Sequence, residues 1–442
     1  MQRKLFAVSM AAALATVSAG AHADADTLSD IFTQGHVDGE LRAYNFNRIY
    51  QTNTVPDAKA FSGAVLLNLR TGTFGGGFSL AASVASANSF GTQSATAAKV
   101  DSSLMGLDDS VTALSQAYLQ YKNGMIQVRG GYQYLNTPWM GSSDSRMIPA
   151  SYNAISVDIT PAKGWDIFAI REFEWKSRTS DDYNSDNLYY PSTYDGDKMY
   201  GNNGSLPATA RSANGTWTVG TTYADGPIKA QGWYYDFLNF TRMGYADGSY
   251  TFHTGTGFDP VIAAQYLTEN GGSDNVLVDM QTKLFGVAGS RVKANAWGGD
   301  LGLVIPHGRF DVFYNKLDSE SGAVGDGALI SPFTTNYASD PLYTTSMIRG
   351  LVEEGPGHAW KAKAAYDLFD AKLQLVAAYA KYTTDLRGDS HDVYFDIIYN
   401  LDGYLKGLTL RDRWERSTGG IAALNPGNES FTYNRLMIAY KF

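Results

Sequence analysis

The sequence predicts an all-β protein, a transmembrane antiparallel up-and-down β-barrel of about 18 strands with one inward-folded constriction loop. Three observations support this fold class. The chain begins with a short apolar segment and has no long one afterwards, windows of alternating polarity recur from end to end, and the last window has one apolar face. We therefore expect a leader at residues 1–23 and a single barrel at residues 24–442.

Residues 1–23 are typical of a secretory signal peptide. Arg3 and Lys4 supply the charged start, residues 5–20 are apolar or small, and the tripeptide 21–23 reads A-H-A, which fits the cleavage rule. The apolar part is short and rich in alanine, so a transmembrane helix is disfavoured. No later apolar run approaches 18 residues, so any membrane crossing must use strands.

The composition excludes several classes of protein. The 442 residues include no cysteine, which excludes an exported disulfide scaffold, and 46 glycines and 29 tyrosines suit many turns and aromatic girdles. Without Arg3 and Lys4, 33 basic residues remain against 44 acidic ones, so the exported chain has a formal charge of −11 and a nucleic-acid partner is not expected. No linker-like tract divides the chain into domains.

Alternating windows of about ten residues, separated by clusters of Gly, Asp, Asn and Ser, predict the individual strands. Residues 243–252 and 260–267 form two of them. The other windows begin near residues 38, 59, 74, 113, 125, 153, 165, 213, 228, 294, 309, 359, 371, 391, 405 and 431. The expected count is thus 18, with an uncertainty of two. A soluble two-sheet sandwich also alternates, but it does not need the last window described next.

The last window, residues 431–442, ends on an aromatic residue at the carboxyl terminus. In a strand, its residues divide between an apolar face and a mixed face, as expected with lipid on one side and a wet lumen on the other. The apolar face holds Leu436, Ile438, Tyr440 and Phe442, and the mixed face holds Arg435, Met437, Ala439 and Lys441.

Short links predict turns on one side of the membrane, and long polar links at 90–112, 135–152, 176–210 and 318–357 predict loops on the other. The segment 135–152 contains Trp139, Asp144 and Arg146 between two prolines that prevent a strand. It is long enough to fold into the barrel and narrow it, with Asp144 and Arg146 producing a transverse field. The acidic stretch 180–187 offers oxygen ligands for calcium, although a solvated loop explains it as well.

Nothing in the chain predicts a catalytic or cofactor site. The histidines have no metal-ligand spacing, no G-x-S-x-G motif occurs, and the glycines at 72 and 75–77 fit a tight turn better than a phosphate cradle. We therefore expect no enzyme activity, no metal and no cofactor. A hydrolase in the barrel wall stays open as an alternative, although no residues identify one.

Basic side chains recur at the positions that face the lumen. Such a row offers a carboxylate successive weak contacts along a pore. The alternative is that each cation is neutralised by a nearby acid such as Glu40, Asp396 or Glu415. Arg411 and Arg413 lie at i and i+2, and two such cations repel unless a ligand or a carboxylate lies between them. This pair therefore favours the functional interpretation. The row comprises Arg42, Arg48, Arg129, Lys361, Lys363, Arg411, Arg413 and Arg435.

Five short motifs are spread over the chain. They are R-A-Y-N-F-N-R at 42–48, S-R-M-I-P at 145–149, W-K-A-K with Y-D at 360–367, L-T-L-R-D-R at 408–413 and N-R-L at 434–436. In order and spacing they resemble the motifs of the OprD family of outer-membrane porins, the carboxylate-selective specific channels. The resemblance covers the chain after the leader, except that residues 203–292 align poorly.

This resemblance implies a passive porin in the outer membrane of a Gram-negative bacterium. It implies uptake of small carboxylate-bearing solutes, contact with outer-membrane lipid, a monomer or loose homotrimer, and an arginine ladder through Arg48, Arg146, Arg411, Arg413 and Arg435. Two positions depart from the family: Arg70 adds a cation near the periplasmic rim, and Asp412 falls on the lipid-facing side. A general or oligosaccharide porin, with Tyr132, Tyr134 and Trp139 stacking on sugar rings, is the alternative.

Overall fold

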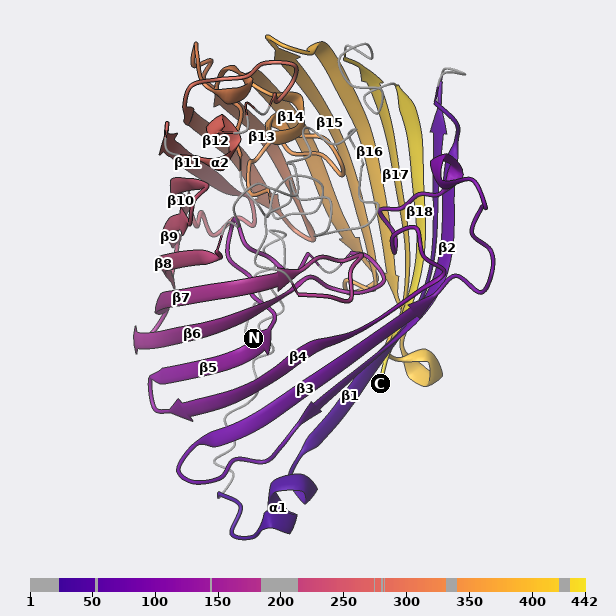
Figure 1. Cartoon of the computed structure of the whole chain (residues 1–442), viewed down its shortest axis with the longest axis vertical. Coiled ribbons are helices and arrows are strands. Elements are labelled where there is room, and N and C mark those ends of the chain that lie inside the picture. The colour runs from indigo at the N-terminus through magenta and orange to yellow at the C-terminus, as the bar shows by residue number, and fades with distance from the viewer. Residues whose placement is uncertain are drawn as a thin grey trace.

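A closed antiparallel β-barrel of 18 strands forms the whole protein (Figure 1). The computed structural model describes residues 24–51, 55–143, 145–183, 214–273, 275–279, 281, 283–330, 340–420 and 430–442. Each strand pairs with its neighbours in sequence, and β1 also pairs with β18, which closes the sheet. The predicted fold class is therefore confirmed, whereas the proposed signal peptide at residues 1–23 lies outside the described residues.

The predicted windows correspond one to one with the observed strands. The third strand begins at Phe78 rather than near residue 74, because Gly75, Gly76 and Gly77 have positive φ and form the turn before it. The strands are β1 His36–Tyr50, β2 Ala58–Arg70, β3 Phe78–Asn88, β4 Ser110–Asn123, β5 Ile126–Gln133, β6 Ser151–Ala162, β7 Trp165–Lys176, β8 Thr216–Asp225, β9 Ile228–Phe237, β10 Thr241–Thr251, β11 Asp259–Gly272, β12 Val292–Ile305, β13 Gly308–Leu317, β14 Gly357–Leu368, β15 Leu373–Thr384, β16 Gly388–Asn400, β17 Leu408–Gly419 and β18 Phe431–Lys441.

The helical segments are short. They are α1 Leu28–Thr33, α2 Val276–Asp279 and α3 Leu351–Glu354, with 3₁₀ turns η1 Ala97–Lys99, η2 Val324–Asp326 and η3 Gly403–Leu405. In the part of the chain that the structure describes, no helix is long and apolar enough to cross a membrane.

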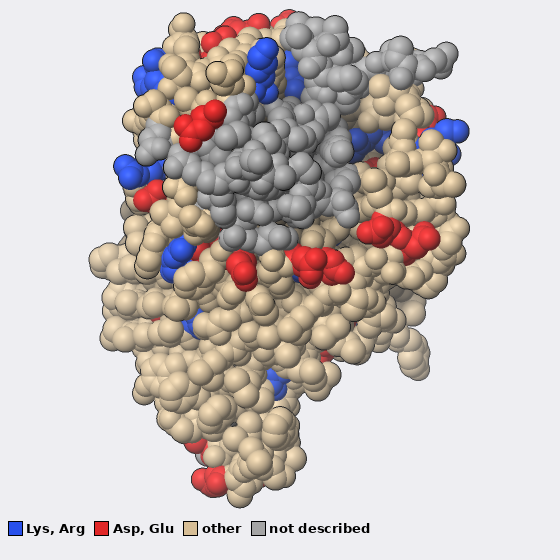
Figure 2. Space-filling model, in the orientation of Figure 1, with Lys and Arg blue, Asp and Glu red and all other residues tan. Residues whose placement is uncertain are grey.

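Side chains alternate between the two faces of the wall as the sequence predicts. On β18, Leu436, Ile438 and Tyr440 are exposed on the outside, while Arg435 and Met437 are buried on the lumen side. The alternation follows from the two-residue period of a strand, and it exposes apolar side chains around the barrel. Figure 2 shows few charged side chains over the lower half of the visible face and more of them above.

The two ends of the barrel differ. At one end, turns such as residues 124–125 and 226–227 join the strands, and α1 and the C-terminal strand end also lie there (Figure 1). At the other end, long connections follow β3, β5, β7, β11 and β13. Parts of these connections pack inside the wall, where they form two buried apolar clusters with lumen-facing side chains.

Candidate functional site

Two arginines on β17, Arg411 and Arg413, share the carboxylate of Asp396 on β16. The Arg411 guanidinium donates to Asp396 through Nε, with Nε to Oδ1 at 2.8 Å, and through Nη2. The Arg413 Nε lies 3.4 Å from Asp396 Oδ2, and Tyr394 donates from its hydroxyl to the same carboxylate at 2.6 Å. Asp396 therefore supplies the carboxylate that this pair requires, so their i, i+2 spacing no longer argues for a ligand.

These two arginines nevertheless remain in contact with the lumen. Their side chains are 30% (Arg411) and 14% (Arg413) exposed, whereas that of Asp396 is only 4% exposed. The register from β16 to β18 has no bulge, so Arg413 stays on the lumen side although Asp412 between them points outward. Two cations against one acid leave an excess positive charge at this place on the wall.

A second pair of cations faces the lumen on β14. Lys361 is buried and donates from Nζ to the Thr345 carbonyl at 2.7 Å, while Lys363 is half-buried. On β15, Ala378 lies opposite Lys363 and also opposite Tyr394. We call Lys361, Lys363, Arg411 and Arg413 the basic strip. The small side chains of β15 separate its two halves and leave an apolar floor between them.

The remaining predicted cations near β1 and β18 are buried. They alternate with aromatic rings: Arg48 lies 4.3 Å from the centroid of Tyr433, Arg435 lies 4.4 Å from Tyr433 and 4.8 Å from Phe46, and Arg146 lies 5.5 Å from Phe46. Such contacts strengthen when they are desolvated. The ring of Phe431 extends this set, because it lies 5.4 Å from Arg48 and 5.3 Å from Arg349. We call these arginines and rings the arginine–aromatic column.

The column anchors the inward loops. Arg42 donates to the Arg146 carbonyl at 2.8 Å and to Glu40 at 2.9 Å, and Arg146 donates to the Ser103 carbonyl at 2.7 Å. Arg42, Arg48, Arg146 and Arg435 are each at most 5% exposed. Their contacts place them in the support of the loops rather than on the open wall.

Asp101 balances the column from the loop between β3 and β4. Its carboxylate lies 4.0 Å from Arg48 Nη2 and accepts from the Ser103 hydroxyl at 2.7 Å. Burial alone would raise the pKa of Asp101, but Arg48, the hydroxyls of Tyr433 and Ser103, and Arg435 together lower it below its usual value. No pattern in the sequence marks this residue, because its partner Arg48 is 53 positions away from it.

Two loops cross the lumen. The loop between β5 and β6 contacts β1 through Arg146 and β9 through Trp139, whose backbone N–H donates to the Tyr235 hydroxyl at 3.3 Å. Because β1 and β9 stand on opposite sides of an 18-strand barrel, this segment bridges the interior. Trp139 is fully buried. Asp144 lies outside the described residues, as do residues 184–187 of the acidic stretch.

The second bridging segment belongs to the loop between β13 and β14. The Tyr343 hydroxyl bonds to Asp247 on β10, and the Met347 N–H donates to Glu415 on β17 at 2.8 Å. Tyr382 on β15 donates to the Thr344 carbonyl at 2.9 Å. Both segments therefore lie inside the wall, bonded to strands on different sides of the barrel.

Acidic side chains that sequence analysis did not single out line the wall beside the basic strip, where Asp311 on β13 lies directly opposite Lys363 on β14. Asp300 on β12 and Asp311 on β13 both bind Arg309, at 2.8 Å and 2.5 Å. The alternation that places the lysines and arginines on the lumen face also places Asp300 and Asp311 there. The same reasoning, applied to acidic residues, could have predicted both. Arg129, the last predicted cation, is half-buried on β5, with its guanidinium 5.8 Å from the ring of Tyr118.

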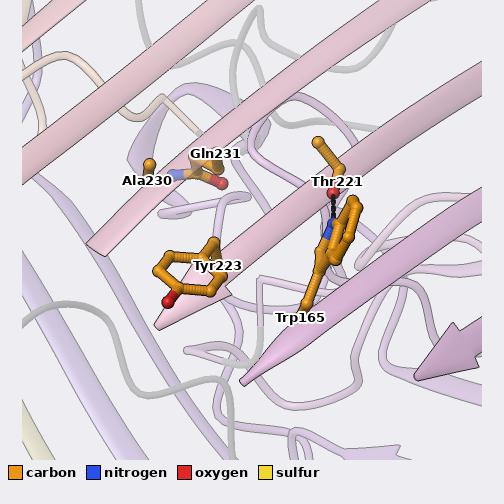
Figure 3. A pocket seen from close by; sticks show the side chains of 5 residues that line it. All are labelled: Trp165, Thr221, Tyr223, Ala230 and Gln231. Atoms are coloured by element: carbon orange, nitrogen blue, oxygen red, sulfur yellow. Dashed lines mark hydrogen bonds between the residues drawn. The ribbon is translucent and has the colours of Figure 1, made fainter. Parts of the chain in front are cut away.

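An open hollow of about 330 Å³ lies on β7, β8 and β9, lined by Trp165, Thr221, Tyr223, Ala230 and Gln231 (Figure 3). The Trp165 indole donates to the Thr221 hydroxyl at 2.8 Å. Trp165, Thr221, Tyr223 and Ala230 occupy outward positions, so the hollow is not part of the pore. Among the described residues, no group of three His, Cys, Asp or Glu side chains could hold a metal ion.

Solved structures with the same fold include Acinetobacter baumannii OccAB3 and Pseudomonas aeruginosa OccK9 (OpdG), each at 15% identity and a TM-score of 0.73. The structure of P. aeruginosa OpdK with vanillate matches at 15% identity and a TM-score of 0.71. Each comparison covers 93% of this chain and 99% of the other. No protein-family model and no curated protein matches the chain. These neighbours are OprD-family porins with 18-strand barrels, so the expected resemblance is confirmed for the fold.

Proposed function

We propose that this chain is an outer-membrane porin of the OprD family, exported from a Gram-negative cell by the signal at residues 1–23. The fold likeness supports this, as does the band of exposed apolar side chains around the wall. Strands in a closed barrel satisfy all their backbone hydrogen bonds, so the structure suits a lipid bilayer. The protein passes solutes passively and catalyses no reaction.

The preferred solutes are small and bear a carboxylate. The basic strip carries this proposal, because Arg411 and Arg413 keep 30% and 14% of their side chains exposed beside a single, nearly buried acid. A guanidinium binds a carboxylate through parallel N–H donors, and an exposed one releases it again easily. A carboxylate that passes the bridging loops therefore meets Arg413, Arg411 and Lys363 in succession.

The apolar floor between the two halves of the strip suits the rest of such a solute. Ala378 and Val376 on β15 lie between Lys363 on one side and the Asp396 group on the other. A flat or apolar body can rest there while its carboxylate contacts a cation. The solved structure of OpdK with vanillate, an aromatic carboxylate, supports the same solute class by analogy.

The oligosaccharide alternative has less support. It relied on aromatic rings displayed near the constriction, but Trp139 is fully buried and Tyr132 stacks on Tyr183 with ring centroids 4.1 Å apart. Rings that are already covered cannot stack on sugars in the pore.

Single-channel recording in a planar bilayer tests the proposal. We expect a reversal potential that favours anions under a salt gradient, and current steps that small carboxylates reduce while uncharged sugars of similar size do not. Large unselective steps would contradict the carboxylate preference, and absence of current would contradict the channel itself.

A further inference from the structure

Asp412 faces outward from the middle of a membrane strand. It occupies the fifth position of β17 (Leu408–Gly419), is exposed, and lies between Arg411 and Arg413, which face the lumen. Of the acids on outward positions in the described strands, the others lie at or close to strand ends, such as Asp225, Asp236 and Asp389. Among the described strands, Asp412 is therefore the outward-facing acid that lies away from the strand ends.

Asp412 belongs to a continuous polar area across three strands. Asn434 on β18 donates from Nδ2 to Asp412 Oδ1 at 2.6 Å, and Asn47 on β1 lies directly opposite Asn434. Asn45 on β1 pairs with Leu436, the residue opposite Asp412. All four polar side chains point outward. We call Asn45, Asn47, Asp412 and Asn434 the seam patch, since it spans the closure of the barrel.

Lipid is an unfavourable neighbour for this patch. An ionised or amide group facing hydrocarbon loses its hydration, and the loss is greatest near the middle of the bilayer. The bond from Asn434 supplies only one of several contacts that a carboxylate can accept. Asn47 Oδ1 is shielded from solvent and has no hydrogen-bond partner among the described residues. The patch therefore has unused donors and acceptors on the outside of the wall.

A loop projects from the same side of the barrel. Gly63 points outward on β2, and the ring of Phe90 covers it so closely that a β-carbon there would come within 2.8 Å of the ring. The Thr92 hydroxyl donates to the Phe61 carbonyl at 3.4 Å. The loop between β3 and β4 thus passes over the outer face of β2, next to the seam patch, and Phe90 remains 67% exposed.

We propose that the seam patch binds a second copy of this chain, related by a two-fold axis along the barrel near β18, which gives a dimer in place of the monomer or loose homotrimer that the family resemblance implies. In each copy β17 and β1 lie on either side of β18. A two-fold axis at β18 therefore places β17 of each copy against β1 of the other. The carboxylate of Asp412 then meets the amides of Asn45 and Asn47 of the second copy, and Asn434 lies close to its own equivalent. Each copy supplies both the acceptor and the donors.

The projecting loop fits the same arrangement. β2 of one copy lies across the axis from β16 of the other, so Phe90 comes next to the second copy's outward Phe395 and Trp414. These two rings already pack on each other, with centroids 5.8 Å apart, and Phe395 is exposed. Interfaces typically combine satisfied polar groups with aromatic contacts of this kind. In helical membrane proteins, polar side chains that hydrogen-bond between transmembrane helices likewise stabilise association.

Disulfide cross-linking in outer-membrane vesicles tests the proposal, because the natural chain has no cysteine. Asn434→Cys, on the strand nearest the axis, is expected to give a covalent dimer on mild oxidation. Ala246→Cys is the matched control, since it points outward from β10 on the opposite side of the barrel. Equal yields from the two variants, or no dimer from Asn434→Cys, would overturn the proposal.

A second variant separates contact between copies from contact with lipid. Asp412→Leu combined with Asn434→Cys should lower the cross-linked fraction several-fold, while channel current confirms that the barrel still forms. If the patch instead faces lipid, the leucine leaves the cross-linked fraction unchanged and makes the barrel more resistant to denaturant. That result would assign the face to the bilayer and refute the interface.

Discussion

Replacing Asp396 with Asn is expected to strengthen the binding of carboxylate solutes in the pore. Asp396 accepts from Arg411 at 2.8 Å and lies 3.4 Å from Arg413, so it neutralises one of the two guanidiniums. Asn keeps the size of the side chain and one acceptor oxygen but removes the charge. Both arginines then become available to a solute, and the local excess charge rises from one to two.

The size of the effect follows from Coulomb's law. A solute carboxylate held by Arg411 or Arg413 would lie about 5 to 6 Å from the Asp396 carboxylate, and an effective dielectric constant of about 40 suits a wall between protein and water. The repulsion removed is then about 1.5 kcal/mol, or about tenfold in affinity. At 1 M salt the screening length is about 3 Å, so most of the gain should disappear.

The assay is the concentration dependence of current block by benzoate, measured at 0.1 M and 1 M salt, together with the reversal potential. Asp38→Asn is the control, because Asp38 also faces the lumen but lies at the short-turn end, with 50% of its side chain exposed. A weaker block in Asp396→Asn would show that Asp396 orients the arginines for binding. An equal change in both variants would show that only the total charge matters.

Three further predictions concern the strip and the loops. Arg411→Ala should reduce carboxylate flux more than sugar flux in liposome swelling, because only the anion uses its donors; equal losses would contradict the role of the strip. Trp139→Ala removes a fully buried ring, a loss of about 3 to 5 kcal/mol in a packed core, and should raise single-channel conductance by freeing the bridging loop. Unchanged conductance would show that this loop does not limit the pore. The pKa of Asp101 lies below its usual value of 3.8, so the ionised carboxylate stabilises the folded loop. This stabilisation is fully present above pH 3.8 and is lost as the pH falls through the lowered pKa. Conductance should therefore rise on acidification below about pH 4, and Asp101→Asn should show the higher conductance at pH 7; a variant identical to the natural protein at both pH values would refute the link.

The barrel could be predicted from the sequence because its two determinants are local. Alternation with a period of two shows directly which residues share a face, and Gly-rich or Asn-rich links show where a strand ends. Leu436, Ile438 and Tyr440 were placed outward on this basis, and the structure agrees. The start of β3 was misplaced by four residues, because glycine turns and strand ends are hard to separate when both contain small residues.

The candidate site was less accessible to sequence reasoning. The alternation of side chains along a strand predicts that Arg48, Arg435 and Arg413 face the lumen, and the structure agrees. The alternation does not show which other residues cover these side chains. Arg48 lies 4.0 Å from Asp101 in the loop between β3 and β4, and Arg435 is only 1% exposed, whereas Arg413 keeps 14% of its side chain exposed. The order of loops inside the barrel depends on long-range packing, which a strand pattern does not record.

Burial therefore divides one chemically uniform row into two sets with different roles. Arg435 is 1% exposed, and two of its nitrogens have no hydrogen-bond partner among the described residues, so its contacts are mainly the rings of Tyr433 and Phe46. A buried guanidinium that lost those rings would be strongly unfavourable, which makes this set a fixed support for the loops. Arg411 contacts water and can exchange Asp396 for a solute carboxylate at little net cost. In the proposed channel, the exposed cations therefore bind the anion, and the buried ones hold the loops in place.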